Sequence, residues 1–153
     1  MPTFSAAISR SAATGGSITQ FDYLNDQFSM EEARLAMMEV KANQKFWYGD
    51  FYPLTRAGTG PDAFAAWQLH RADLGAGIVL AFRRSECPFP ALQTGLHALK
   101  AGVQYKVEVI DEARNCREQT VSGRELLSDF ELRLPKKATS LLLRYREGSS
   151  QGR

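Results

Sequence analysis

The chain has 153 residues, of which 44% are hydrophobic and 24% are charged, a composition typical of one globular domain. Its 19 basic residues nearly balance 17 acidic ones and are scattered among them, so the basic stripe of a nucleic-acid binder is missing. No apolar run reaches the roughly 20 residues of a membrane helix, and the polar N-terminus has no apolar signal segment. We therefore expect a cytoplasmic protein that binds neither nucleic acid nor membranes.

The N-terminal segment, residues 1–17, is rich in alanine, serine, threonine and glycine. Few of these residues can anchor it, so we expect a flexible lead-in. Residues 18–21 have the β-branched and aromatic character of a short strand. The loop after them contains Asp22 and Asp26, which we interpret as capping or turn-forming residues.

A helix is predicted to begin after Ser29. Ser29 and Glu32 have the spacing of a capping box, in which each side chain bonds the backbone amide of the other residue. Apolar residues at helical spacing then define one stripe, made of Met30, Ala33, Met37 and Val40. Packing in the core is the favoured use of this stripe, and binding of a partner is the alternative.

From about residue 62 onward the hydrophobic pattern has a period of two, which is typical of strands. Five segments show it: residues 63–69, 78–82, 105–109, 130–134 and 141–145. Turn-rich stretches separate the segments, so we predict a mainly β fold. It would be an antiparallel β-sandwich of Greek-key type over residues 56–147, preceded by one amphipathic α-helix and followed by a disordered tail at 148–153.

The residues that usually carry chemistry do not form a recognisable motif. His70, His97, Cys87 and Cys116 lack the spacing of a zinc site, and the cysteines are either free thiols or one disulfide. The glycine-rich segments lack the lysine and hydroxyl residue of a phosphate-binding loop. No carboxylate pair can be placed on one rigid wall, so we expect no metal and no cofactor.

An aromatic run, KFWYGDFYPLT, follows the predicted helix at residues 45–55. It could be a surface for stacking sugars, a nucleic-acid platform, or the seam between helix and sheets. Large rings bury much apolar area, roughly 150–250 Å² each. The seam is the favoured interpretation, with Gly49 allowing a close turn and Asp50 bonding backbone amides. The rings concerned are Phe46, Trp47, Tyr48, Phe51 and Tyr52.

Ordered motifs along most of the chain carry a family resemblance. They are GDFYPL, WQLHRADLGAGIVLAFRR, YKV, VSGREL and LLLRYR, at residues 49–54, 67–84, 105–107, 121–126 and 141–146. In this order and spacing, over roughly residues 18–147, they resemble the C-terminal part of family-36-type α-galactosidases and their melibiase-like relatives.

The resemblance implies a fold and separate roles for two parts of the enzyme. In those glycoside hydrolases a (β/α)8 barrel is followed by a small antiparallel β-sandwich, and two catalytic aspartates lie on barrel strands. Residues 18–55 would then be a remnant of the last barrel strand and helix with an aromatic linker, and the catalytic segments would precede Met1. No catalytic residue can be carried over, and Asp22 would lie at the rim where barrel active sites are built.

Three functions are compatible with this sequence. The first is a non-catalytic C-terminal β-sandwich domain, with a catalytic barrel or a second copy as partner through the Met30, Ala33, Met37 and Val40 stripe. The second is a carbohydrate-binding module that holds oligosaccharides with Trp67, His70 or the aromatic run. The third and least favoured is a small hydrolase that depends on Asp22 or Asp50.

Overall fold

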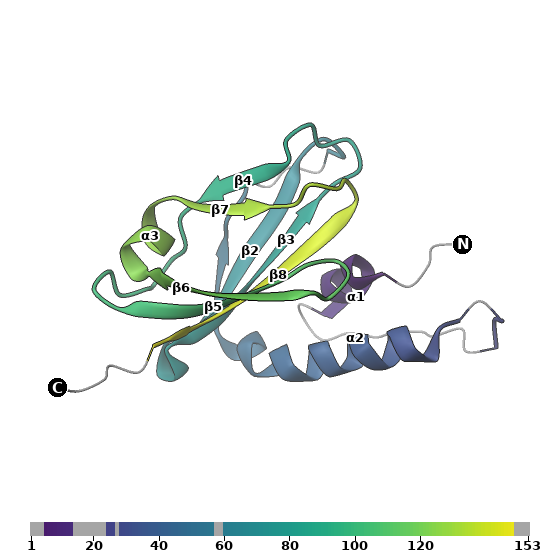
Figure 1. The fold of residues 1–153 in the computed structure, drawn as a ribbon, viewed down its shortest axis with the longest axis horizontal. Coiled ribbons are helices and arrows are strands. Elements are labelled where there is room, and N and C mark those ends of the chain that lie inside the picture. The colour runs from purple at the N-terminus through teal and green to yellow at the C-terminus, as the bar shows by residue number, and fades with distance from the viewer. Residues whose placement is uncertain (1–4, 14–23, 27, 57–59, 149–153) are drawn as a thin grey trace.

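A computed structural model describes residues 5–13, 24–26, 28–56 and 60–148. A six-stranded sheet forms the middle layer, with the helices α1 and α2 on one face and a small two-stranded sheet with α3 on the other (Figure 1). The helices are α1 (Ala6–Ala12), α2 (Met30–Asn43) and α3 (Gly123–Ser128). The large sheet has the order β1 (Asp50–Pro53), β2 (Phe64–Arg71), β3 (Ala76–Arg83), β8 (Thr139–Glu147), β5 (Gln104–Ile110), β6 (Cys116–Ser122), and the small sheet pairs β4 (Ala91–Thr94) with β7 (Phe130–Arg133).

The mainly β architecture with a preceding helix confirms the prediction from the sequence. Every strand pair is antiparallel, and β8 lies between β3 and β5 in the middle of the large sheet. All five segments with period two are strands. In the part of the chain that the structure describes, no helix has the length and hydropathy required to cross a bilayer.

Helix α2 begins where the capping residue predicts. The Ser29 hydroxyl accepts a hydrogen bond from the Glu32 amide at 3.2 Å, which satisfies one of the free donors of the first turn. The Glu32 carboxylate, which the capping box would pair with the Ser29 amide, instead forms an ion pair with Arg114 at 2.7 Å. A 3-10 helix over Gln44–Tyr48 continues α2 toward the sheet.

The predicted stripe of α2 is right for Ala33 and Val40, which are buried and half-buried, and wrong for its two methionines. Met30 is 70% exposed and Met37 is exposed too, whereas Ala33 and Ala36 are buried. Small side chains suit the buried side because α1 lies between α2 and β8, so the helices approach closely (Figure 1). Periodicity located a helix here, but methionine hydrophobicity did not identify its inner face.

Helix α1 occupies part of the segment that we expected to be flexible. Its anchor is Arg10, which is 2% exposed and donates to Glu39 of α2 at 2.7 Å and to the Ser140 hydroxyl of β8 at 3.0 Å. The Ala7 amide also donates to Glu112 at 2.9 Å. These long-range partners hold a helix whose own residues are small. The predicted strand at residues 18–21 lies outside the described residues.

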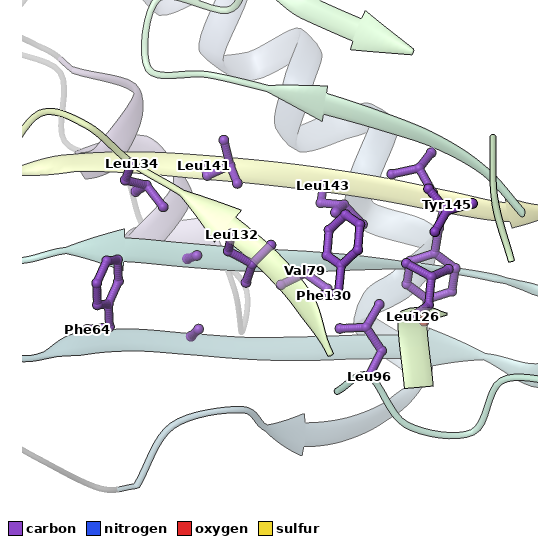
Figure 2. Close-up of a cluster of buried hydrophobic side chains, with 14 of the residues drawn as sticks. Phe64, Val79, Leu96, Leu126, Phe130, Leu132, Leu134, Leu141, Leu143 and Tyr145 are labelled. Carbon is purple, nitrogen blue, oxygen red and sulfur yellow. The ribbon is translucent and has the colours of Figure 1, made fainter. Parts of the chain in front are cut away.

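Each face of the large sheet carries its own hydrophobic core, because side chains alternate along every strand. The larger core lies toward β4, β7 and α3 and includes Val79, Leu132 and Leu143 (Figure 2). The smaller core lies toward the helices and includes Phe46, Ile78, Leu80, Ile110 and Leu142, with Trp47, Trp67 and Phe82 packed against it.

Candidate functional site

The aromatic run is divided between core and surface. Phe46 is 4% exposed in the smaller core, and Trp47 packs beside it. Tyr48 is 80% exposed and Phe51 is exposed as well. Tyr52 stacks on the ring of His97, with centroids 5.0 Å apart. The first two rings therefore join the end of α2 to the sheet, while other rings of the run reach solvent.

The residues between these rings occupy the edge of the sheet. Gly49 lies so close to β2 that an added Cβ would stand 2.3 Å from the His70 carbonyl oxygen. A glycine is therefore required by this close approach, although its backbone is extended. Asp50 is the first residue of β1 and lies opposite His70 in the strand pairing.

The two proposed sugar-binding residues of β2 point to opposite faces of the sheet. Trp67 lies toward the helices, stacked on Phe82 with centroids 5.2 Å apart, and its indole N–H is buried without a hydrogen-bond partner among the described residues. His70 is buried on the other face. The structure does not bring them together into one surface. Asp22, the third proposed contact, lies outside the described residues.

His70 instead belongs to a buried polar cluster. The amide of Gln68 donates to the Tyr145 hydroxyl at 2.7 Å and to the His97 carbonyl oxygen at 2.9 Å, and it accepts from the His97 amide at 2.8 Å. A ring nitrogen of His70 lies 2.9 Å from the same Tyr145 hydroxyl. Gly77 leaves the space for that hydroxyl, since a Cβ would stand 2.2 Å from it.

Burial determines the protonation of this cluster. It lowers the pKa of His70, an effect that the negative charges of Asp50 and Glu147 partly oppose. It also raises the pKa of the Tyr145 phenol. Both groups are neutral at pH 7, so the cluster is a satisfied hydrogen-bond network. Its closed surroundings favour a structural role.

A large cleft lies elsewhere, between the end of α2 and strands β5, β6 and β8. Its volume is about 550 Å³, within the range of small-molecule sites. Ala42, Lys45 and Phe46 form the wall on the helix side. The helices cover the sheet only in part, so polar side chains of the strands line the rest. The polar strand residues that face the helices here are Lys106, Glu108, Glu118, Thr120, Arg144 and Arg146.

The strand pairing sorts the charges of this cleft into two ends. Lys106 of β5 lies opposite Arg146 of β8. Two residues further along, Glu108 lies opposite Arg144 of β8 on one side and Glu118 of β6 on the other. A basic end and a mixed, acidic end therefore stand side by side on one polar surface.

Sequence reasoning missed this carboxylate pair and the strand that supplies half of it. The charged and polar sequence of β6, which begins at Cys116, has no hydrophobic alternation. The only signal was the alternation of β5, which places Lys106 and Glu108 on one side. Glu108 is within 3.5 Å of Arg144, and the open position of both carboxylates does not give one of them the apolar surroundings of a catalytic acid.

Among the described residues, no group of three or more histidine, cysteine or acidic side chains is placed to hold a metal ion. Both cysteines are free thiols, Cys87 buried and Cys116 exposed. Burial and the nearby charges of Glu108 and Glu118 raise the pKa of the Cys116 thiol, which disfavours the reactive thiolate. Neither cysteine has the surroundings of a nucleophile.

Comparison with known proteins rests on structure alone. No family model and no curated protein matches the sequence. The architecture is that of a β-sandwich with a helical layer at its N-terminal side, and solved glycoside hydrolases contain it. A variant of the GH36 α-galactosidase AgaA from Geobacillus stearothermophilus in complex with raffinose matches 92% of this chain, with a TM-score of 0.68 and 20% identity.

Two further α-galactosidase structures also match this chain. AgaB, a GH36 α-galactosidase from the same organism, also matches with a TM-score of 0.68, 20% identity and 92% coverage. The galactosidase domain of the α-galactosidase–sucrose kinase AgaSK matches 79% of this chain at 17% identity and a TM-score of 0.57. This chain spans only 19% of the AgaA and AgaB chains. Its fold is therefore that of one part of GH36 α-galactosidases, which confirms the resemblance at the level of fold.

Proposed function

We propose that this chain is a non-catalytic C-terminal β-sandwich region of a GH36-like glycoside hydrolase, and that it supports a catalytic (β/α)8 barrel. The observation that carries the proposal is the match of 92% of the chain to about a fifth of an α-galactosidase. A fifth of such an enzyme is too small to contain a (β/α)8 barrel, which typically needs about 250 residues.

Among the described residues, the carboxylates of the large cleft lack the surroundings of a glycosidase acid pair, which supports a non-catalytic role. Retaining glycosidases need two carboxyl groups about 5–5.5 Å apart, one of them held protonated by its surroundings. Among the described residues, Glu108 and Glu118 are the carboxylates of the large cleft. Arg144 neighbours Glu108, and Glu118 is exposed.

The outer side of α2 supplies a surface for the barrel. Met30, Met37 and Met38 are exposed there, and Tyr48 follows at the end of the 3-10 helix. Methionine side chains adapt to irregular apolar partners. This surface replaces the stripe expected from the sequence, since Ala33 faces inward. The barrel is the occupant that we propose, because the matched α-galactosidases are about five times as long as this chain.

Co-expression tests the proposal. A GH36 α-galactosidase shortened by the matched part is produced with and without this chain, and solubility, co-purification and α-galactoside hydrolysis are measured. We expect this chain alone to be inactive, and to bind and solubilise the shortened enzyme. The double variant Met37→Glu, Met38→Glu should lose binding, whereas Phe89→Glu, at an apolar position elsewhere that is even more exposed, should retain it. Hydrolysis by the pure chain, or no binding, would refute the proposal.

A further inference from the structure

The basic end of the large cleft carries an electrostatic cost. Lys106 and Arg146 are directly opposite on neighbouring strands, where side chains are about 4.5–5.5 Å apart at Cβ and like charges are destabilising. Both side chains project toward the helices, on the side of the sheet that also carries Ile110 and Leu142. The sequence thus places two cations together at the floor of a cleft.

Neither of these cations is neutralised within the described residues. The ion pairs there involve other groups, and Lys106 and Arg146 are in none of them. Arg144, on the same strand, is different, because it donates to the Asn43 side chain at 2.8 Å and lies 3.5 Å from Glu108. The free cations are therefore confined to one end of the cleft.

A third cation faces this end from the helical wall. Lys45 lines the cleft, and its ammonium lies 5.1 Å from the centroid of the Phe46 ring. The negative end of the α2 dipole and this ring both favour a positive charge at Lys45. Lys106 and Arg146 have no such compensation, so they are the pair that an anion would stabilise most.

The other end of the cleft selects what is attached to the anion. Glu108 and Glu118 would repel a second negative charge, but their oxygens accept hydrogen bonds from hydroxyl groups. The Thr120 hydroxyl, on the same face of β6 as Glu118, adds a further polar group at this wall. The lining thus favours a ligand with one anionic group and several hydroxyls.

We propose that this cleft is a binding site for a small hydroxylated anion, a sugar acid or a sugar phosphate. Lys106 and Arg146 bind its anionic group, and Glu108 and Glu118 accept from its hydroxyls. A volume of about 550 Å³ is large enough for one or two sugar rings, since typical ligand sites span about 300–1,000 Å³. The site is independent of the barrel-docking surface on the outer side of α2.

Binding can be measured by NMR on the isotope-labelled full chain, with four separate titrants at low salt. These are galacturonate, galactose 6-phosphate, neutral galactose and inorganic phosphate. We expect saturable shifts at the amides of β5, β6 and β8 around Lys106 and Arg146 with the two charged sugars. Galactose and inorganic phosphate should each bind about tenfold more weakly, because each lacks one half of the recognised groups.

Matched variants separate a site from general charge attraction. Lys106→Gln and Arg146→Gln should each weaken galacturonate binding by about tenfold, the loss of one charge-assisted hydrogen bond. Lys137→Gln, in the turn at the opposite end of β8, should bind as the native chain does. Equal weakening by Lys137→Gln, equal affinity for inorganic phosphate, or an absence of shifts would each overturn the proposal.

A stability measurement gives a second readout that does not require the sugar. Without ligand, Lys106→Gln should shift the urea midpoint of unfolding to a higher concentration, because it relieves the repulsion with Arg146. A saturating charged sugar should then stabilise the native chain more than the variant, since a ligand stabilises the folded state that binds it. A variant that is less stable than the native chain without ligand would show that the two cations do not repel, against the proposal.

Discussion

The two faces of the six-stranded sheet are covered in different ways. Toward β4, β7 and α3, a continuous hydrophobic core is closed by a second layer (Figure 2). The polar groups at its edge, Gln68, His70 and Tyr145, are hydrogen-bonded to one another. Toward the helices, the described residues cover a smaller core only in part, and among them the buried indole N–H of Trp67 has no partner and a charged cleft is open. We therefore expect the closed face to contribute more to stability than the half-covered face.

Strand β8 runs between both environments and allows the comparison to be tested within one element. Leu142 and Leu143 are adjacent and fully buried, but they point into the smaller and the larger core respectively. Both are leucines, and both lie between strands β3 and β5. A difference between their variants therefore reports the difference between the two faces.

The largest effect is expected from Leu143→Ala, which should lower the free energy of unfolding by about 3–5 kcal/mol, because a cavity between two sheets cannot collapse. Leu142→Ala should cost less, about 2–3 kcal/mol, since short helices can move toward the space. Urea unfolding followed by circular dichroism measures both. Equal costs, or a larger cost for Leu142→Ala, would mean that the helical layer is as rigid as the second sheet.

The next effect concerns the polar cluster of the closed face. Gln68→Leu keeps the approximate size of the side chain but removes three hydrogen bonds, two of them to the His97 backbone. Because polar groups are then left unpaired in a buried site, we expect a loss of about 2–3 kcal/mol. Gln93→Leu, at an exposed position of β4, should change stability by less than about 0.5 kcal/mol in the same assay. Similar values for both would show that the buried network contributes little.

The closed face and the open face were not equally predictable from the sequence. Strands β5, β7 and β8 carry hydrophobic alternation, whereas β2 and β3 are mostly apolar because both of their faces are covered. The existence of all five could therefore be predicted. Strand β6 is an edge strand with mostly exposed residues, and its polar sequence gave no period. The cleft depends on β6 and therefore could not be found before the structure.

The helical layer shows a second limit of prediction from the sequence. Ser29 located the start of α2 because a cap acts within one turn, but the inner side of α2 is decided by distant partners. Arg10 anchors α1 through Glu39 and Ser140, residues far away in the sequence. Ala33 and Ala36 fit this packing by their small size, which hydrophobic periodicity does not measure.

The pH dependence of the free energy of unfolding should also distinguish the two faces, with a smaller effect than the substitutions above. Burial lowers the pKa of His70 in the folded chain, whereas an unfolded histidine has a pKa of about 6.5. Below that value the unfolded chain binds the proton more readily. The contribution of His70 is therefore complete above pH 6.5 and is lost as the pH falls toward the folded-state pKa.

We expect the free energy of unfolding of the native chain to fall more steeply between about pH 7.5 and 5.5 than that of His70→Asn, which cannot titrate there. Urea unfolding at several pH values gives both slopes. Because other groups titrate alike in the two proteins, the difference isolates His70. Identical slopes would contradict a neutral, buried His70.

The smallest effect is expected on the half-covered face, next to Gln68. Trp67→Phe removes an indole N–H that is buried without a partner among the described residues, and it retains an aromatic ring against Phe82. The gain from removing an unpaired donor and the loss of ring contacts oppose each other, so we expect a change within about 1 kcal/mol. Urea unfolding provides the value. A loss of several kcal/mol would show that the indole N–H has a partner, and the half-covered face would then be as well satisfied as the closed one.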